Sequence, residues 1–259
     1  MKKEKLTIIK VGGKIVEDEP ALMRLLVDFS SITGKKLLVH GGGRSATALA
    51  ARLGIETKMV DGRRITDDAM LEVVVMVYGG LVNKRIVAGL QAVGVNAVGL
   101  TGADMDVVLS VRRPAGKVDY GWVGDVRRVN ADAVSMLIEN GCCPVIAPIT
   151  HDGEGHLLNT NADTMAGETA KALAQRYEVE LVYCFEKAGV LSDGNDDSSV
   201  IREINSCKYK ELKDSGVVSG GMIPKLDNAF ACISAGVSRV VITRADLIAD
   251  ADAGTKIAG

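Results

Sequence analysis

Short apolar runs alternate with longer segments of helical periodicity along most of the chain. The runs at 6–11 and 37–39 end in glycine-rich turns, as buried strands often do. The segments at 22–29 and 46–53 place apolar residues three or four positions apart, which predicts amphipathic helices. The same criteria predict strands at 95–100, 143–149, 181–185 and 237–243, and helices at 67–93, 131–140, 161–177, 208–214 and 222–236.

This alternation is typical of an α/β fold. Strands that are each followed by a helix favour a largely parallel open sheet with helices on both faces. Two hairpins are predicted within it, one around Asp61-Gly62 and one joining the runs at 107–112 and 118–129. The pattern restarts after residue 177, so we expect two lobes, 1–177 and 178–259.

The composition refines this picture mainly by excluding partners. Hydrophobic residues make up 47% of the 259 residues but aromatic residues only 3%, so the core is expected to be aliphatic. A net charge of −2 and the scarcity of aromatic stacking side chains argue against a nucleic acid partner. No uncharged apolar run approaches the roughly 18 residues of a membrane span, so no membrane partner is expected.

Cysteine and histidine usage indicates a reducing compartment and no resident metal. The five cysteines are odd in number, form no C-x-x-C pair and stand mostly among apolar residues, which favours buried thiols. The three histidines form no recognisable ligand set, and His151 and His156 flank a polar turn. We therefore expect a cytoplasmic protein without a protein-built metal site.

Two glycine-rich turns follow the first two predicted strands and suggest an anion-binding edge. Gly12-Gly13 follows the first strand and Gly41-Gly42-Gly43 follows the second. Ligands of open α/β sheets bind at the carboxyl ends of the strands, where glycine lets backbone N–H groups approach an anion closely. Tight turns for packing would use the same glycines, so neither turn decides the matter alone.

Charged residues near these turns have both a structural and a catalytic interpretation. Lys10 lies near the end of the first strand, as either a lysine that reaches solvent or a fixed cation for a transferring phosphoryl group. Lys225 falls in the first turn of a predicted helix, where a cation opposes the helix dipole unless an anion lies nearby. Asp163 follows the turn residues Asn159 and Asn161, and it either complements a helix dipole or belongs to a site.

A dinucleotide-binding enzyme is an alternative on these residues. Gly41-x-Gly43-x-x-Ala46 matches the dinucleotide fingerprint between a strand and a helix. Asp61 lies roughly where a ribose-binding acid would be expected, but in a hairpin turn rather than after a parallel strand.

In chain order, five motifs resemble those of the amino acid kinase family, and the resemblance runs nearly from end to end. Each motif is common alone, but the ordered set is specific. The motifs are K-x-G-G at Lys10, H-G-G-G at His40, G-x-R-x-T at Gly62, N-x-N-A-D at Asn159 and G-G-M-I-x-K at Gly220. The resemblance implies that ATP, with Mg²⁺ held mainly by its phosphates, donates its γ-phosphoryl group to the γ-carboxylate of N-acetyl-L-glutamate, a step of arginine biosynthesis.

The resemblance also implies a role for each matching residue. The first lobe would bind the acylated amino acid and form the dimer contact, and the second would bind ATP. Lys10 and Lys225 would flank the phosphoryl group in transfer, and Asp163 would hold both lysines. Gly42, Gly43, Arg64 and Asn159 would bind the acceptor, and Gly12, Gly13, Glu186, Gly189, Gly220, Gly221 and Met222 the nucleotide.

Elementary chemistry agrees with these roles. A γ-carboxylate with a pKa of about 4.3 is already ionised at neutral pH, so its attack on phosphorus needs no general base. The difficulty is to bring one anion onto another, which calls for lysines, glycine turns and helix N-termini rather than a Ser/His/Asp set.

One segment departs from the family pattern, and several acceptors stay open. Phe185-Glu186-Lys187 stands where relatives carry a segment like S/T-D-V, which leaves the adenosine and phosphate contacts of this segment undecided. The alternative acceptors are N-succinyl-L-glutamate, another N-acyl dicarboxylic amino acid or a carrier-bound aminoadipate. More distant alternatives are a carbamate or uridylate kinase and a non-catalytic ligand sensor with a kinase fold. Arg64 with Asn159 favours an acylamino dicarboxylate instead, and the presence of Lys10, Asp163 and Lys225 argues against a sensor.

The resemblance also bears on assembly. Hexameric, arginine-inhibited relatives carry an extra helix before the first strand, whereas here residues 1–5 precede it. We therefore expect a homodimer that arginine does not inhibit.

Overall fold

One eight-stranded sheet crosses the molecule. The computed structural model describes residues 3–60, 62–250 and 252–259. Neighbouring strands run parallel except for one antiparallel pair, β13 with β14. The expected α/β class with a largely parallel open sheet is therefore confirmed. The strand order is β12 (Glu203–Ile204), β14 (Thr255–Ile257), β13 (Arg239–Arg244), β11 (Glu178–Phe185), β1 (Lys5–Val11), β2 (Lys35–His40), β8 (Cys143–Ile146) and β5 (Ala97–Leu100).

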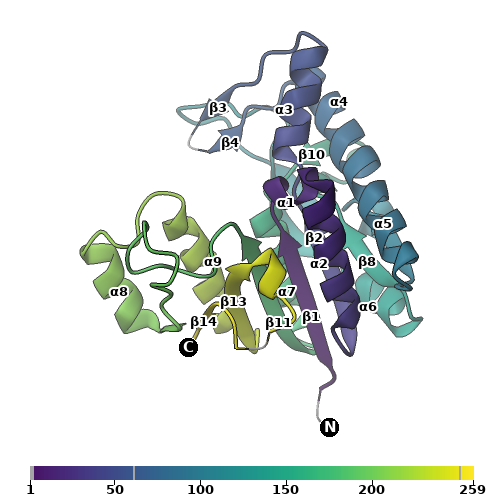
Figure 1. Ribbon diagram of the computed structural model, residues 1–259. Coiled ribbons are helices and arrows are strands. Elements are labelled where there is room, and N and C mark those ends of the chain that lie inside the picture. Colours follow the sequence, from purple (N-terminus) through teal and green to yellow (C-terminus); the bar gives the residue numbers. More distant parts are fainter. Residues whose placement is uncertain (1–2, 61, 251) are drawn as a thin grey trace.

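Helices cover both faces of this sheet, as Figure 1 shows. Each face has its own apolar core, because successive strand residues point to opposite sides. The first face carries α6 (Ala131–Glu139), α7 (Ala162–Leu173), α8 (Ser206–Asp214) and α9 (Met222–Ser234). The second carries α1 (Gly13–Glu17), α2 (Glu19–Ser31), α3 (Gly43–Arg52), α4 (Asp68–Val74), the π-helix η1 (Val75–Val82) and α5 (Asn83–Ala92).

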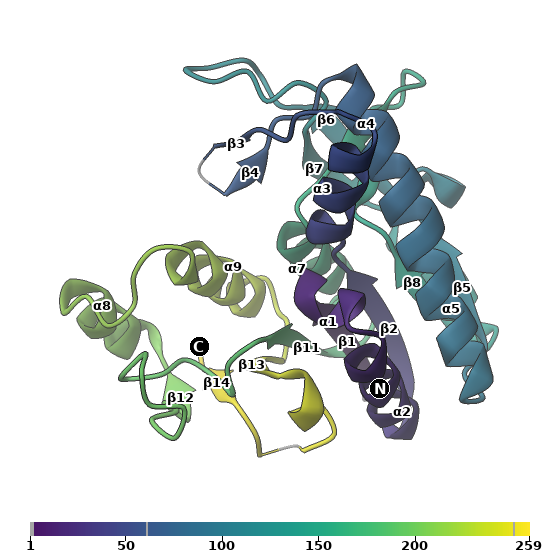
Figure 2. The same cartoon turned by 45° about the horizontal axis from the view of Figure 1, so that its top comes forward.

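Smaller elements stand above the carboxyl ends of the central strands. A four-stranded sheet has the order β10 (Leu157–Asn159), β9 (Ile149–His151), β6 (Val108–Arg112) and β7 (Gly124–Val129). The hairpin of β3 (Met59–Val60) and β4 (Arg63–Arg64) reaches out on the side of α9 (Figure 2). Two short 3₁₀ turns, η2 (Asp104–Asp106) and η3 (Ala245–Leu247), complete the described elements.

Side-chain caps begin two helices where the sequence predicts them. The Asn130 side chain accepts a hydrogen bond from the Ala133 N–H at the start of α6. The Asn161 side chain accepts from the N–H groups of Asp163 and Thr164, at 2.9 and 3.0 Å, at the start of α7. Such caps typically contribute about 1 kcal/mol to stability. The cap at Asn161 also fixes the position of Asp163 in the first turn of α7.

The observed elements differ from the predicted ones at a few places. The predicted strand at 143–149 is split, because Ala147-Pro148 turns the chain between β8 and β9. The predicted strand at 118–129 begins only at Gly124. The five-residue α1 directly after β1 was not predicted, since a segment this short carries little periodicity.

The longest helical segment is apolar and about half-buried. The 25 residues Asp68–Ala92 are long and apolar enough to cross a membrane by length and composition, and half of the most apolar window is buried inside the protein. Buried helices of soluble proteins meet the same criterion. The expectation of no membrane partner therefore stays a prediction.

The predicted lobe boundary coincides with the start of β11. β11 pairs along its length with β1 in parallel register, with Lys10 opposite Tyr183. The two predicted lobes thus share one sheet, and the division at residue 177 stays a prediction. In Figure 2 the elements after β11, including α8 and α9, lie to one side of β1 and β2.

Candidate active site

The two glycine turns meet at the carboxyl ends of β1 and β2. The Gly41 N–H donates to the Val11 carbonyl at 3.0 Å, which ties the second turn to the end of the first strand. A Cβ added to Gly41 would lie 3.5 Å from the Gly13 nitrogen, so the two backbones run in contact. α1 and α3 begin directly at these turns. The sequence prediction of an edge with free backbone N–H groups therefore has a structural basis.

Lys10 and Asp163 form the charged centre of this edge. Lys10 shares a strand face with Leu6 and Ile8, so its side chain points toward α7, where Asp163 lies in the first turn. Its Nζ lies 2.7 Å from Asp163 Oδ1, and the two side chains are only 8% and 17% exposed. The pair lacks hydrogen-bond alignment, so Asp163 Oδ1 has no hydrogen-bond partner among the described residues. Lys10 is thus a buried cation rather than a lysine that reaches solvent.

Lys225 comes to the same place from α9. Burial lowers its pKa, while the nearby Asp163 carboxylate acts in the opposite direction. Its Nζ lies 3.7 Å from the centre of the Phe185 ring, and Lys10 Nζ lies 5.4 Å from the same ring. The three residues proposed for catalysis, Lys10, Asp163 and Lys225, are therefore brought together.

A large cavity of about 930 Å³ opens onto these three residues. Its lining holds six cationic side chains and two acidic ones, which favours a polyanionic ligand. One acid, Glu186, pairs with Lys14, and the other is Asp163. Two of the cations, Lys14 and Arg44, were not singled out from the sequence, although they directly follow the two glycine turns. The six cations are Lys10, Lys14, Arg44, Arg64, Lys187 and Lys225.

The predicted nucleotide residues divide into two groups. Gly12, Gly13, Glu186, Gly189 and Met222 line the large cavity. Gly189 is also a packing residue, because a Cβ there would lie 2.7 Å from Thr255 Oγ1. Gly220 and Gly221 line none of the cavities described for residues 3–60, 62–250 and 252–259. Their nucleotide contact stays a prediction.

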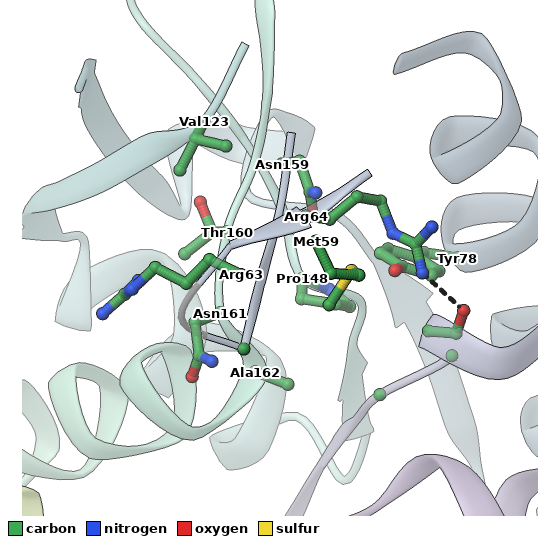
Figure 3. A pocket seen from close by; sticks show the side chains of 14 residues that line it. Met59, Arg63, Arg64, Tyr78, Val123, Pro148, Asn159, Thr160, Asn161 and Ala162 are labelled. Carbon is green, nitrogen blue, oxygen red and sulfur yellow. Dashed lines mark hydrogen bonds between the residues drawn. The ribbon is translucent and has the colours of Figure 1, made fainter. Parts of the chain in front are cut away.

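A smaller cavity of about 200 Å³ adjoins the large one and shares Gly43, Met59 and Arg64 with it. All four residues predicted for the acceptor line it, namely Gly42, Gly43, Arg64 and Asn159. Figure 3 shows Arg64 above the Tyr78 ring and Arg63 on the opposite side of the pocket. The Asn159 amide donates to Thr66 Oγ1 at 3.0 Å, which fixes the orientation of its carbonyl oxygen.

Arg64 is a buried cation whose protein partners are neutral. Its Nη2 donates to the Gly43 carbonyl at 2.7 Å, the contact dashed in Figure 3, and to Thr47 Oγ1 at 2.9 Å. Its Nη1 donates to Thr57 Oγ1 at 3.3 Å. The ion pairs found among the described residues do not include Arg64, although only 8% of the residue is exposed. Because an unpaired buried charge is costly, this guanidinium is suited to a carboxylate ligand.

A buried histidine supports the second glycine turn. His40 is fully buried, and burial lowers its pKa to about 4, so the ring is neutral at pH 7. Nδ1 lies 2.7 Å from the Gly41 carbonyl and donates to it, and Nε2 accepts from the Asn83 amide at 3.1 Å. Asn83 also donates to the Val145 carbonyl. Within the H-G-G-G motif, His40 therefore holds the glycine turn that follows it in place.

Two sequence expectations fall outside this site. Asp61, the ribose-binding acid of the dinucleotide alternative, lies outside the described residues. Asp152, Glu154 and His156 place one possible ligand atom each within 4.8 Å of one another in the turn between β9 and β10. Two of the three are exposed, and exposed acidic groups are common without a metal ion. The expectation of no protein-built metal site stays a prediction.

Comparison with known proteins places this geometry in a family. The model of the Amino acid kinase family matches residues 5–244. The chain is 68% identical to the acetylglutamate kinase of Phocaeicola vulgatus over 95% of this chain and 96% of that protein. It is 64% identical to the acetylglutamate kinase of Bacteroides thetaiotaomicron over 98% and 99% of the two chains. The solved structure of smu.665 from Streptococcus mutans superposes with a TM-score of 0.80 at 29% identity, over 97% of this chain and 98% of that one.

These likenesses extend over nearly the whole chain and include both cavities. The family model spans Lys10, Arg64, Asn159, Asp163 and Lys225 alike. The chain therefore belongs to the amino acid kinase family, among its acetylglutamate kinases.

Proposed function

We propose that this chain transfers the γ-phosphoryl group of ATP to the γ-carboxylate of N-acetyl-L-glutamate and forms an acyl phosphate and ADP. The observation that carries the proposal is the junction of the two cavities. A small pocket that contains the buried Arg64 guanidinium shares Gly43, Met59 and Arg64 with a large cavity lined with cations. This arrangement suits two anionic substrates that meet at one point.

The smaller cavity supplies the acceptor contacts. Arg64 pairs with the α-carboxylate in a two-pronged ion pair, for which a guanidinium is better shaped than an ammonium. A carboxylate oxygen then replaces one of the neutral acceptors that Nη2 now contacts, the Gly43 carbonyl or the Thr47 hydroxyl. The backbone N–H groups of Gly42 and Gly43 bind the carboxylate end, and the Asn159 carbonyl oxygen accepts from the acylamino N–H. The remaining γ-carboxylate then faces the large cavity.

The large cavity supplies the charge for phosphoryl transfer. An oxygen of the ionised γ-carboxylate forms a bond to the γ-phosphorus while the bond to the β,γ-bridging oxygen breaks, so ADP leaves and no proton moves. Lys10 and Lys225 stabilise the charge on the transferring group, and Asp163 holds Lys10 in place at 2.7 Å. Mg²⁺ bound to the nucleotide would neutralise further phosphate charge. Its ligands would be mainly phosphate oxygens, because Asp163 and Glu186 are paired with lysines.

N-succinyl-L-glutamate is the second candidate acceptor. It carries one more carboxylate than the acetyl compound, and Arg63 supplies a second cation to the lining of the smaller cavity. In Figure 3 the Arg63 side chain extends on the side of the pocket opposite Arg64. In this alternative, Arg63 would pair with the added carboxylate.

A hydroxylamine-trapping assay tests both acceptors. Purified chain with Mg-ATP is offered N-acetyl-, N-succinyl- and free L-glutamate, and acyl hydroxamate and ADP are measured together. We expect hydroxamate from an N-acylated glutamate and none from the free amino acid, because its ammonium would add a positive charge to a cavity that already contains Arg63 and Arg64. Absence of hydroxamate from all three would contradict the proposed function, and a higher kcat/KM for the succinyl compound would assign that acceptor.

We also propose that the protein is a cytoplasmic homodimer without a nucleic acid or membrane partner. The five cysteines are free, as expected in a reducing compartment. The segment Asp68–Ala92 carries the exposed apolar side chains Met76 and Leu81, which support a contact between two copies.

A further inference from the structure

Phe185 contacts both lysines of the proposed catalytic centre. It is the last residue of β11, and its ring packs on the sheet face that α7 and α9 cover. Lys225 Nζ lies 3.7 Å from the ring centre and Lys10 Nζ lies 5.4 Å from it. Both distances fall within the range of cation–π attraction, about 6 Å. One aromatic ring therefore lies within cation–π distance of two ammonium groups.

The ring is itself held by a second aromatic residue. Tyr183 precedes Phe185 by two positions on the same strand face, and the two rings stack at 6.0 Å with an angle of 9° between their planes. The Tyr183 hydroxyl donates to the main-chain carbonyl oxygen of Asp163 at 3.2 Å. The aromatic pair thus contacts all three charged residues of the centre, and its position is fixed by β11.

The contact with the Phe185 ring matters more for Lys225 than for Lys10. Lys10 has Asp163 as a partner at 2.7 Å, whereas no ion pair of Lys225 occurs among residues 3–60, 62–250 and 252–259. Burial lowers the pKa of Lys225, and the nearby Lys10 charge acts in the same direction. The negative face of an aromatic ring stabilises an ammonium without competing with phosphate oxygens for it, because its attraction is weaker than that of a carboxylate.

We propose that Phe185 is a positioning residue that keeps the Lys225 ammonium aimed into the cavity until the nucleotide triphosphate takes it over. The proposal rests on the proposed phosphoryl transfer, since it assigns Lys225 to the transferring group. It also gives a role to a segment in which Phe185 stands apart from the family pattern.

Kinetics of Phe185→Leu and Phe185→Tyr test the role of the ring. Leucine keeps an apolar side chain but removes the aromatic face, so kcat should fall about ten-fold while the KM of the acceptor stays within about two-fold. Tyrosine keeps the face and should restore kcat to within about two-fold of the parent. The matched control is Phe230→Leu, because Phe230 lies on α9 with Lys225 but stacks on Tyr209 instead. An unchanged kcat in Phe185→Leu, or an equal fall in the control, would overturn the proposal.

A double-mutant cycle separates action through Lys225 from a general effect on the fold. Phe185→Leu is combined with Lys225→Met, and residual turnover is followed by ADP release. If the ring acts through the lysine, the phenylalanine substitution should cost less than about two-fold in the Lys225→Met background. A second ten-fold loss there would show that Phe185 acts independently, and the proposal would be wrong.

A spectroscopic measurement keeps the proposal testable without turnover. Lysines are reductively ¹³C-methylated, and the Lys225 signal is assigned by its loss in Lys225→Arg. An ammonium 3.7 Å above a ring should give an upfield signal that returns to the ordinary position in Phe185→Leu and moves toward it on addition of a non-hydrolysable Mg-ATP analogue. A Lys225 signal without this ring-current shift would overturn the proposal. If the shift is present but no acceptor gives hydroxamate, the contact stands and the proposed function is the part that fails.

Discussion

At the scale of single residues, the site around Lys10 fits an ammonium group better than a larger cation. Its ammonium lies 2.7 Å from Asp163 in a space that is almost closed to solvent. A guanidinium is larger and planar, so Lys10→Arg would preserve the charge but not its position. We expect kcat to fall about 100-fold or more, the size of effect seen when one preorganised charge donor is lost. Hydroxamate formation at saturating substrates is the measurement.

Lys5→Arg is the matched control for this substitution. Lys5 begins the same strand and also pairs with a carboxylate, Glu180, at 2.7 Å, but its side chain is largely exposed. Turnover should stay within about two-fold of the parent. Turnover of Lys10→Arg near that of the parent would remove Lys10 from the proposed mechanism.

Arg64 should affect acceptor binding rather than the nucleotide. Arg64→Lys keeps a positive charge but loses the fork that now donates to Gly43 and Thr47. We expect the KM of the acceptor to rise about ten-fold or more, with the KM of ATP changed by less than about two-fold. The same substitution at the exposed Arg52 of α3 is the control. Equal rises for both substrates would place Arg64 elsewhere in the reaction.

The sequence could identify these residues but not the contacts among them. Lys10, Arg64 and Asp163 were recognised because motifs in a fixed order surround them, and period-two alternation then predicts the face of Lys10. The partners of Arg64 among the described residues are neutral because a hairpin folds back over α3, which no local pattern encodes. Phe185 was recognised only as a departure, because its contacts come from β1 and α9, far away in sequence.

At the scale of elements, the anchoring of the second glycine turn predicts a pH dependence of stability. The pKa of His40 is lowered from its ordinary 6.5 to about 4 by burial. Between these values the unfolded chain binds a proton that the folded chain does not bind. The stabilising contribution is therefore complete above pH 6.5 and is lost as the pH falls toward 4. At pH 5 the loss should reach about 2 kcal/mol.

His40→Gln supplies the comparison for this prediction, because glutamine does not titrate. The free energy of unfolding in urea is measured at pH 7.5 and pH 5 for the parent and the variant. The parent should lose about 2 kcal/mol more than the variant between the two pH values, even if the variant is less stable throughout. Identical losses would mean that His40 is not the buried neutral histidine described above.

The elements differ in how far sequence could specify them. The starts of the helices predicted at 131–140 and 161–177 could be located from the sequence because a cap is a local interaction, made here by Asn130 and Asn161. The π-helix Val75–Val82 could not be predicted, since its run of apolar residues and paired glycines fits an ordinary helix equally well. Its irregularity matters at the site, because a Cβ added to Gly42 would lie 2.8 Å from the Tyr78 ring on this segment.

At the scale of the whole molecule, the same π-helix offers a surface for a second copy. Met76 and Leu81 are 50% and 51% exposed, and they are five residues apart. In a π-helix, hydrogen bonds join residues five apart, so the Met76 and Leu81 side chains lie about one turn apart on the same side of the helix. We expect light scattering to give twice the mass of the single chain, and Met76→Glu/Leu81→Glu to give the mass of one chain.

This prediction joins assembly to the site, because one segment serves both. Tyr78 packs against the Gly42 turn, while Met76 and Leu81 on the same π-helix are exposed. A partner that covers the exposed side would restrain the segment on which the acceptor turn rests. The dissociated variant should therefore show a several-fold higher KM for the acceptor and an ordinary KM for ATP. Met136→Glu, which charges an equally exposed methionine on α6, should change neither mass nor KM. A parent with the mass of one chain or of six would contradict the proposed dimer, and dissociation with an unchanged acceptor KM would separate assembly from the site.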